Sequence, residues 1–142
     1  MTQVTVRRTI EAPAEALFDA WLNPDSLAIW MRPRGVSHSE CKVDPRVGGA
    51  FEIVMHNHEG PIRHTGSYQV IDRPKRLVFT WISIHTQQQE SQVTVEFHPE
   101  NGKTEVVITH VQLPQEVVQQ HFEGWTLILE ALAQEAQNVQ TH

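Results

Sequence analysis

The feature that most constrains the fold of this chain is a long amphipathic helix predicted near the C-terminus, from Pro114 to about Asn138. Apolar residues recur there at steps of three and four, which places them on one side of a helix. The predicted stripe consists of Val118, Phe122, Trp125, Ile128, Leu129, Leu132 and Ala136. A helix of this length is a rod of roughly 37 Å, about as long as a small domain is wide. It therefore needs a broad apolar surface to cover its stripe.

Most of the sequence before this helix predicts short strands. Alternating apolar and polar residues, separated by turn residues, mark about seven of them. The predicted strands are 4–10, 36–43, 50–56, 64–71, 77–85, 92–98 and 104–111. Two short helices are predicted after the first strand, one opening near Pro13 and one over 26–30. The order favours an α+β domain in which a curved antiparallel sheet wraps around the final helix.

Length, charge and cysteine content narrow the class of protein. With 142 residues, the chain is predicted to be one domain over 1–142. The formal net charge of −6 argues against binding nucleic acid, and no apolar run approaches the length of a membrane span. Cys41 is the sole cysteine, so we expect a reducing cytoplasm and no internal disulfide. Cys41 itself is interpreted as structural filler rather than a reactive thiol.

Three sequence phrases carry a family resemblance. They are Asp-Pro-Arg-Val-Gly-Gly at 44–49, Arg-Leu-Val-Phe-Thr-Trp at 76–81 and His-Phe-Glu-Gly-Trp at 121–125. Together with the element order, they resemble the SRPBCC superfamily, also called Bet v 1-like or START-like. More narrowly, they resemble its branch named after the C-terminal domain of the activator of Hsp90 ATPase. The resemblance covers essentially the whole chain and implies a helix-grip fold with a pocket between the sheet and the long helix.

Glycines in two of these phrases carry structural predictions. Gly48 and Gly49 stand at the entrance to a strand and predict a sharply bent backbone where a side chain would clash. Gly124 lies inside the predicted helix, where glycine costs about 1 kcal/mol relative to alanine, and this favours close packing or a bend there. Its neighbour Trp125 is interpreted either as plain core or as a pocket wall.

Strand alternation also yields a set of candidate ligand-binding residues. Val70 is predicted to share the inward face of Tyr68. The inward-facing residues include several aromatic side chains and few polar groups, which suits an apolar ligand held by one or two hydrogen bonds. The alternative is that these side chains fill the interior completely. The candidate set is Trp30, Met31, Phe51, Ile53, Met55, Tyr68, Phe79, Trp81, His110, His121, Trp125 and Leu129.

Nine histidines raise the question of chemistry. We expect His110 and His121 to approach the pocket, either as general acid or base or as hydrogen-bonding groups. His56 and His58, with His64 across a hairpin, have the character of metal ligands. They lack a convincing acidic or cysteine partner, and the sequence therefore predicts no metal and no cofactor.

The predicted function is binding of a small hydrophobic or aromatic molecule between the sheet and the C-terminal helix. Two alternatives stay open: a protein-interaction, co-chaperone-like module, and a cyclase- or hydrolase-type enzyme that uses the pocket histidines. No catalytic residue is assigned, and a binding domain is favoured over an enzyme. A homodimer stays open, but a chaperone partner is not supported, because fold similarity does not transfer function by itself.

Overall fold

One antiparallel sheet of seven strands curves around a long helix in the computed structural model, which describes residues 2–33 and 35–140. The spatial order of the strands is β1-β7-β6-β5-β4-β3-β2. Each strand lies beside its sequence neighbour except β1, which pairs with β7. The strands are β1 (Thr2–Ile10), β2 (His38–Val43), β3 (Ala50–Asn57), β4 (Gly60–Asp72), β5 (Arg76–Trp81), β6 (Ser91–Glu100) and β7 (Lys103–Leu113).

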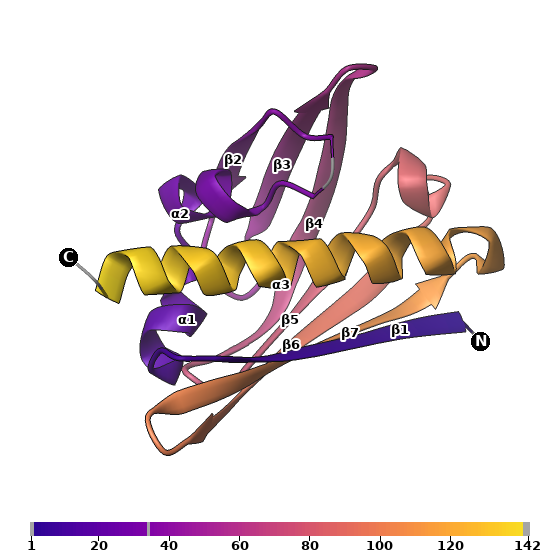
Figure 1. Cartoon of the computed structure of the whole chain (residues 1–142). Coiled ribbons are helices and arrows are strands. Elements are labelled where there is room, and N and C mark those ends of the chain that lie inside the picture. Colours follow the sequence, from indigo (N-terminus) through magenta and orange to yellow (C-terminus); the bar gives the residue numbers. More distant parts are fainter. Residues whose placement is uncertain (1, 34, 141–142) are drawn as a thin grey trace.

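The helices cover one face of this sheet. Helix α3 (Val118–Gln140) crosses the sheet, and α1 (Ala14–Ala20) and α2 (Pro24–Trp30) lie near its C-terminal half (Figure 1). Two short 3-10 turns, η1 (Ile84–Thr86) and η2 (Gln115–Val117), lie towards its other end. None of the helices in the described residues is both long enough and apolar enough to cross a membrane. The α+β helix-grip architecture predicted from the sequence is confirmed.

The strand predicted over 77–85 ends earlier than expected, at Trp81. The hydroxyl of Ser83 accepts a 3.0 Å hydrogen bond from the backbone N–H of His85 and caps the turn η1. Thr86 adds a hydrogen bond from its hydroxyl to the carbonyl of Ser83. Serine and threonine compete for backbone groups in this way, so they terminate the strand ladder locally. The turn carries His85 towards α3 instead of along the sheet.

The inner face of α3 differs by one position from the predicted stripe. Phe122 is 44% exposed, whereas His121 is buried. His121, Trp125 and Leu129 recur every four residues, and this row faces the sheet. Phe122 is rotated by one residue step, about 100°, away from this row. The prediction that Phe122 belongs to the buried stripe is therefore wrong.

A bulge in β4 corrects a second prediction. The register of β4 with β5 shifts between Tyr68, which pairs with Phe79, and Val70, which pairs with Val78. Phe79 and Val78 are adjacent in the chain, so they project from opposite faces of the sheet. Tyr68 is buried on the inner face, but Val70 is turned to the outer face. The prediction that Tyr68 and Val70 share a face is wrong because one extra residue reverses the alternation.

The glycine pair at the start of β3 adopts the tight geometry predicted for it. Gly48 has φ of +85°, a conformation that side-chain-bearing residues rarely adopt. A Cβ on Gly49 would lie 2.2 Å from the carbonyl oxygen of Asp44. The same segment is fixed to β4, since the N–H of Gly48 and the carbonyl of Gly49 both bond the backbone of Tyr68. The turn is thus a structural element of the sheet.

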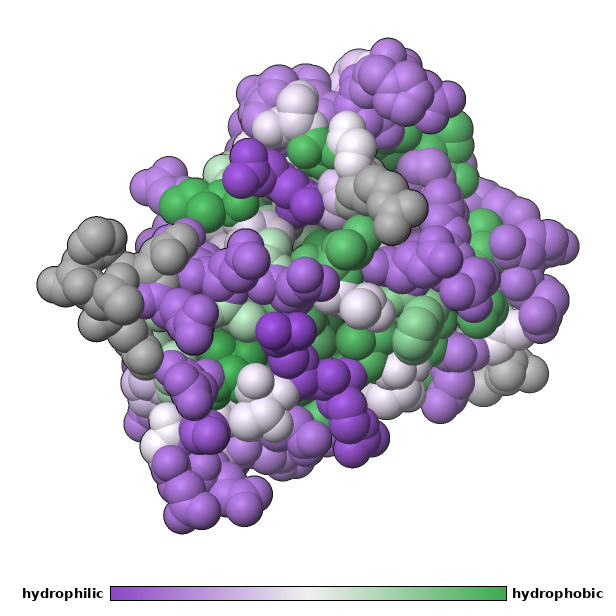
Figure 2. All heavy atoms as spheres, in the orientation of Figure 1, coloured by the Kyte–Doolittle hydropathy of each residue, from purple (hydrophilic) through white to green (hydrophobic). Residues whose placement is uncertain are grey.

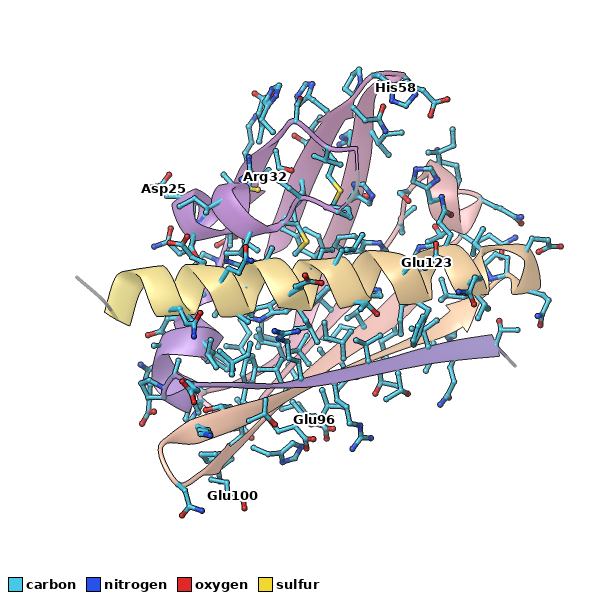
Figure 3. All side chains as sticks on the ribbon, viewed as in Figure 1. Asp25, Arg32, His58, Glu96, Glu100 and Glu123 are labelled. Carbon is cyan, nitrogen blue, oxygen red and sulfur yellow. The ribbon has the colours of Figure 1, made fainter. Side chains whose placement is uncertain are left out.

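The surface around α3 mixes polar and apolar groups. Figure 2 shows hydrophilic side chains along the exposed side of the helix, with hydrophobic patches visible beside it. Charged residues such as Glu96 and Glu100 of β6 project from the side of the sheet opposite α3 (Figure 3). The apolar residues thus lie mainly between sheet and helix, where the candidate site is found.

Candidate functional site

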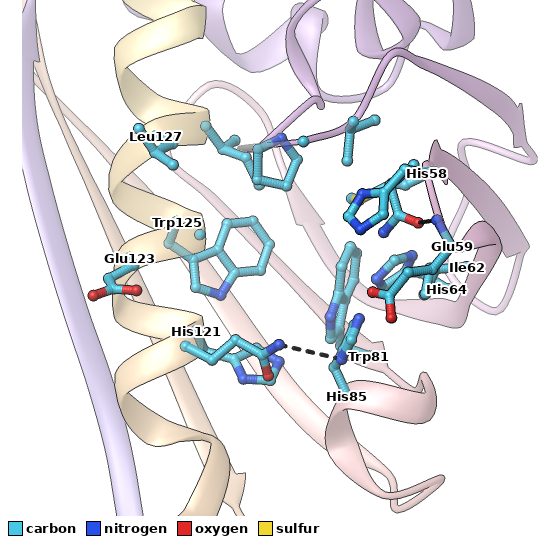
Figure 4. Close-up of a pocket in the computed structure, with 18 residues that line it drawn as sticks. His58, Glu59, Ile62, His64, Trp81, His85, His121, Glu123, Trp125 and Leu127 are labelled. Atoms are coloured by element: carbon cyan, nitrogen blue, oxygen red, sulfur yellow. Dashed lines mark hydrogen bonds between the residues drawn. The ribbon is translucent and has the colours of Figure 1, made fainter.

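A cavity of about 320 Å³ lies between the N-terminal half of α3 and the part of the sheet formed by β3, β4 and β5 (Figure 4). The sheet side contributes Met55, Ile62, His64 and Trp81, and the helix side contributes His121, Gly124, Trp125 and Ile128. Pro33 and Val36, from the segment between α2 and β2, complete the wall. The interior between sheet and helix is therefore not completely filled by side chains.

Two indole rings form the deep wall of the cavity. The ring centroids of Trp81 and Trp125 are 5.2 Å apart, with their planes at 52°. Trp81 is the last residue of β5, and Trp125 is the middle residue of the buried row of α3. Both are almost completely buried. Aromatic side chains of this kind offer large, rigid, apolar surfaces to a ligand.

A chain of hydrogen bonds behind this wall fixes the indole of Trp125. Its Nε1 donates to Nδ1 of His110 at 2.9 Å, and Nε2 of His110 lies 2.7 Å from Oγ of Ser91. Oγ of Ser91 in turn donates to the carbonyl of Trp81 at 2.6 Å. A carbonyl can only accept and an indole N–H can only donate, so the position of every proton in this chain of hydrogen bonds is determined. His110 is neutral, with its proton on Nε2.

His110 therefore lies behind the cavity wall and both its ring nitrogens are engaged. Burial, together with the nearby ring of His121, lowers the pKa of His110 to about 3. A protonated ring would place a second N–H against the N–H of Trp125. In this arrangement His110 orients Trp125 and has no free nitrogen to exchange protons with a ligand.

His64 and His121 line the cavity itself. Burial lowers the pKa of His64 to about 4, and burial also lowers the pKa of His121. Nδ1 of His64 bonds the carbonyl of Ile53 at 3.3 Å, and Nδ1 of His121 bonds the carbonyl of Val117 at 2.8 Å. Because the carbonyl only accepts, each Nδ1 carries the proton and each Nε2 is an acceptor. The cavity wall thus includes two neutral imidazoles with acceptor nitrogens.

Polar groups surround the entrance. His58 and Glu59 lie at the tip of the β3–β4 hairpin (Figures 3 and 4), and both are exposed. On the other side, the side-chain amide of Gln120 lies 3.3 Å from Nδ1 of His85, joining α3 to η1 (Figure 4). The entrance is therefore bounded by a hairpin tip and by a helix-to-turn contact.

Gly124 leaves open space where the sequence suggested close packing. Apart from the backbone of its own helix and its chain neighbours, a Cβ built on Gly124 meets no heavy atom of the described residues within 4 Å, and the residue lines the cavity. The close-packing interpretation of Gly124 is wrong. Its lack of a side chain instead contributes to the free volume beside Trp125.

The structure divides the sequence-predicted ligand-binding residues into three groups. Met55, Trp81, His121 and Trp125 line the large cavity. Trp30, His110 and Leu129 are buried in the core and line neither this cavity nor a second void. That void, of about 10 Å³, is lined by Trp81 and by five further candidates: Met31, Phe51, Ile53, Tyr68 and Phe79.

Several cavity residues were not found from the sequence. Ile62 and His64 precede the bulge in β4 and share the inward face with Met55. A longer predicted strand would have shown Ile62, whereas His64 began the predicted strand but was considered only as a metal ligand. Pro33 lies in an irregular segment, for which alternation gives no signal. Val36 and His85 lie at the ends of the predicted strands 36–43 and 77–85, which are shorter in the structure. The sequence therefore located the aromatic wall but not the entrance.

The histidines considered as metal ligands do not come together as a group. His64 is buried on the inner face, but His56 projects from the outer face. Within residues 2–33 and 35–140, the side chains close enough to share one ion are His38, Glu40 and His56. Cys41 is a free, half-buried thiol, and burial raises its pKa to about 11, which agrees with its interpretation as filler.

Solved structures share this fold. A protein from Chromobacterium violaceum is 23% identical, with a TM-score of 0.85 over 95% of this chain and 96% of that one. An AHSA1-like protein from Aeromonas hydrophila is 25% identical, with a TM-score of 0.79 over 99% and 96%. An HSP90 activator from Plasmodium falciparum is 26% identical, with a TM-score of 0.71 over 89% of each chain.

The comparison with curated proteins finds no match. The comparison with protein families matches residues 11–137, which span both short helices, six of the seven strands and most of α3. The motif phrases at 44–49, 76–81 and 121–125 all lie within this match. The chain belongs to the family described as Activator of Hsp90 ATPase homolog 1-like protein.

Proposed function

We propose that this chain binds a small aromatic or otherwise hydrophobic molecule in the cavity between α3 and strands β3 to β5. The observation that carries the proposal is a cavity of about 320 Å³ whose deep wall is the Trp81–Trp125 pair. Ligand pockets are typically apolar clefts of about 300–1,000 Å³ with a few placed polar groups. This volume lies at the lower end of that range, so it favours a compact ring compound over a long acyl chain.

The two cavity imidazoles suggest which polar group the ligand carries. His64 and His121 are neutral and donate through Nδ1 to backbone carbonyls, so their Nε2 atoms accept. A hydroxyl or amine N–H on the ligand would complete such an acceptor. We therefore expect a ring compound with one hydrogen-bond donor, such as a phenol.

A protein-interaction module is the competing function, and one similar structure is that of an HSP90 activator. The cavity supports the small-molecule function better, since a protein-interaction surface needs no cavity walled by two tryptophans. We place this binding function in the cytoplasm, because a free thiol such as Cys41 persists in a reducing compartment.

The test measures the binding of 2-naphthol, indole and phenol by calorimetry. Tryptophan fluorescence provides a second measurement, since Trp81 and Trp125 line the cavity. Native mass spectrometry of freshly purified protein would look for a retained molecule in parallel. Gly124→Leu places a side chain in the open space beside Trp125, whereas Gly124→Ala adds only one methyl group. We expect Gly124→Leu to weaken binding at least about tenfold, or 1.4 kcal/mol, and Gly124→Ala to weaken it much less.

The proposal fails if no compound binds saturably and no molecule is retained by the protein. It fails equally if both Gly124 variants bind as tightly as the wild type, because binding then occurs elsewhere. Circular dichroism of each variant checks that the fold is intact.

A further inference from the structure

A second constellation of side chains lies on the outer face of the sheet, where β2 pairs with β3. His38 is the cross-strand partner of His56, and Glu40 lies two residues further along β2. Alternate residues of a strand share a face, so all three side chains project from the same side of the sheet. Their ligand atoms lie within 4.8 Å of one another. Strand register, rather than sequence spacing, brings them together.

We propose that His38, Glu40 and His56 bind one divalent transition-metal ion. Two imidazoles and one carboxylate form a nitrogen- and oxygen-donor set that suits Zn²⁺, Co²⁺ or Ni²⁺ better than Ca²⁺ or Mg²⁺, which prefer oxygen ligands alone. Three protein ligands leave one or more coordination positions for water. The site is separate from the cavity, because Met55 and His56 are adjacent in β3 and face opposite sides.

Hydrogen bonds around His38 leave one ring nitrogen available. Oγ of Ser37 donates to the carbonyl of His56 at 3.1 Å, so it accepts from the ring of His38, whose Nδ1 lies 3.1 Å away. The proton of neutral His38 is therefore on Nδ1, and its Nε2 carries a lone pair. A hydrogen bond of this kind to the second ring nitrogen is the usual support of a metal-binding histidine.

The other two ligand atoms already face each other. Nε2 of His56 lies 2.5 Å from Oε1 of Glu40. A tetrahedral Zn²⁺ site needs ligand atoms about 3.4 Å apart, which follows from bonds of about 2.1 Å. His38 and Glu40 are exposed and can turn, and the rings of His38 and His56, now stacked at 4.2 Å, would rotate apart around the ion. The backbone need not move.

Charges nearby do not compete for Glu40. Among the described residues its ion pair is with His56. The neighbouring cations Lys42 and Arg63 both lie against Glu52, which is the cross-strand partner of Lys42 and forms an ion pair with Arg63. The Glu40 carboxylate therefore remains available to an ion.

An ion at this position would tie the edge strand β2 to β3, so bound metal should stabilise the fold by mass action. The test uses untagged full-length protein freed of metal by a chelator. Zn²⁺ binding is measured by calorimetry, Co²⁺ binding by its visible absorption spectrum, and thermal unfolding with and without Zn²⁺. We expect one ion per chain, a raised midpoint of unfolding, and a Co²⁺ spectrum that indicates fewer than six ligands.

The variants are His38→Ala and Glu40→Gln, and the second preserves shape while removing the charge. Each should weaken Zn²⁺ binding at least about tenfold. The matched control is His98→Ala. His98 lies 3.7 Å from Glu96 on β6, but in the part of the chain that the structure describes this pair belongs to no group of three possible ligands. It should leave Zn²⁺ binding unchanged.

Wild-type binding no tighter than that of the His38→Ala, His56→Ala double variant would overturn the proposal. Equal weakening by His98→Ala would overturn it as well, since the histidines would then act as scattered surface ligands. Circular dichroism of the chelator-treated variants shows whether a lost signal reflects lost ligands or lost folding. If His38→Ala does not fold, Glu40→Gln decides the outcome, because removing one exposed carboxylate charge leaves the strand pairing intact.

Discussion

The indole nitrogen of Trp125 donates a 2.9 Å hydrogen bond to Nδ1 of His110, and this contact fixes the cavity wall to strand β7. The bond begins a chain that continues through Ser91 to the carbonyl of Trp81. Both tryptophans of the wall are thus joined through buried polar groups. The ring of His110 therefore positions Trp125, and neither of its nitrogens is free to bind another group.

Breaking this chain should destabilise the protein. His110→Phe keeps an aromatic ring but leaves the N–H of Trp125 and the hydroxyl of Ser91 without their ring partner. Ser91 keeps its bond to the carbonyl of Trp81, but the buried N–H of Trp125 is left unpaired, which costs about 1–3 kcal/mol of unfolding free energy. Urea denaturation would measure the loss, and Thr109→Ala, at the neighbouring position of β7 on the other face, is the control. A loss no larger than that of the control would contradict the assigned hydrogen-bond chain.

The buried histidines should make stability fall in mild acid. The folded-state pKa values of His64 and His110, about 4 and about 3, lie below the ordinary value of 6.5 because burial disfavours the charged ring. The unfolded chain therefore takes up protons first as the pH drops. Stability is complete above 6.5 and is lost between 6.5 and those folded-state values. The slope is up to about 1.4 kcal/mol per pH unit for each histidine.

Urea denaturation at about pH 7.5 and about pH 5.5 would measure this loss, since these values bracket the titration of an ordinary histidine. His64→Gln should reduce the difference between the two, and the exposed His98→Gln should not. A difference that is the same in both variants would show that His64 is not held neutral by burial.

Two glycines should respond to alanine in opposite ways. A Cβ on Gly66 would lie 1.9 Å from the carbonyl oxygen of Thr80 and close to the ring of Phe51, so Gly66→Ala should unfold the protein or cost several kcal/mol. A Cβ on Gly124 meets no described atom within 4 Å outside its chain neighbours and its own helix backbone, and alanine is the better helix former by about 1 kcal/mol. Thermal unfolding of the two variants would show the contrast. Destabilisation by Gly124→Ala would mean that the helix needs its glycine for backbone geometry.

Cys41 should react slowly with thiol reagents while the protein is folded. Burial raises its pKa to about 11, so little thiolate is present near neutral pH. We expect the native protein to react with Ellman's reagent at least about tenfold more slowly than the urea-unfolded chain, since the ordinary cysteine pKa is near 8.5. Similar rates in the two states would show that β2 opens readily at the sheet edge.

Periodicity alone accounts for most of the fold. Alternation between turn residues located all seven strands, and steps of three and four residues located α3, since these patterns record burial directly. Trp81 and Trp125 were recognised as candidates for the same reason. Both occupy regular elements whose inner face can be read from the sequence.

The failures have different physical causes. Val70 was misplaced because a bulge depends on the partner strand β5, which the local sequence does not encode. Phe122 was placed in the buried stripe because of its hydrophobicity, but the buried row through Trp125 and Leu129 contains His121, which was predicted only as a pocket residue. His38 and His56 are close together because of the register of β2 with β3, so no linear sequence motif predicts their proximity.

Because Gly124 has no side chain, the width of the cavity depends on a single turn of α3. A larger side chain at that one residue would reduce the space beside Trp125. Position 124 takes no part in strand pairing, so the dimensions of the cavity can change by substitution while the sheet stays constant.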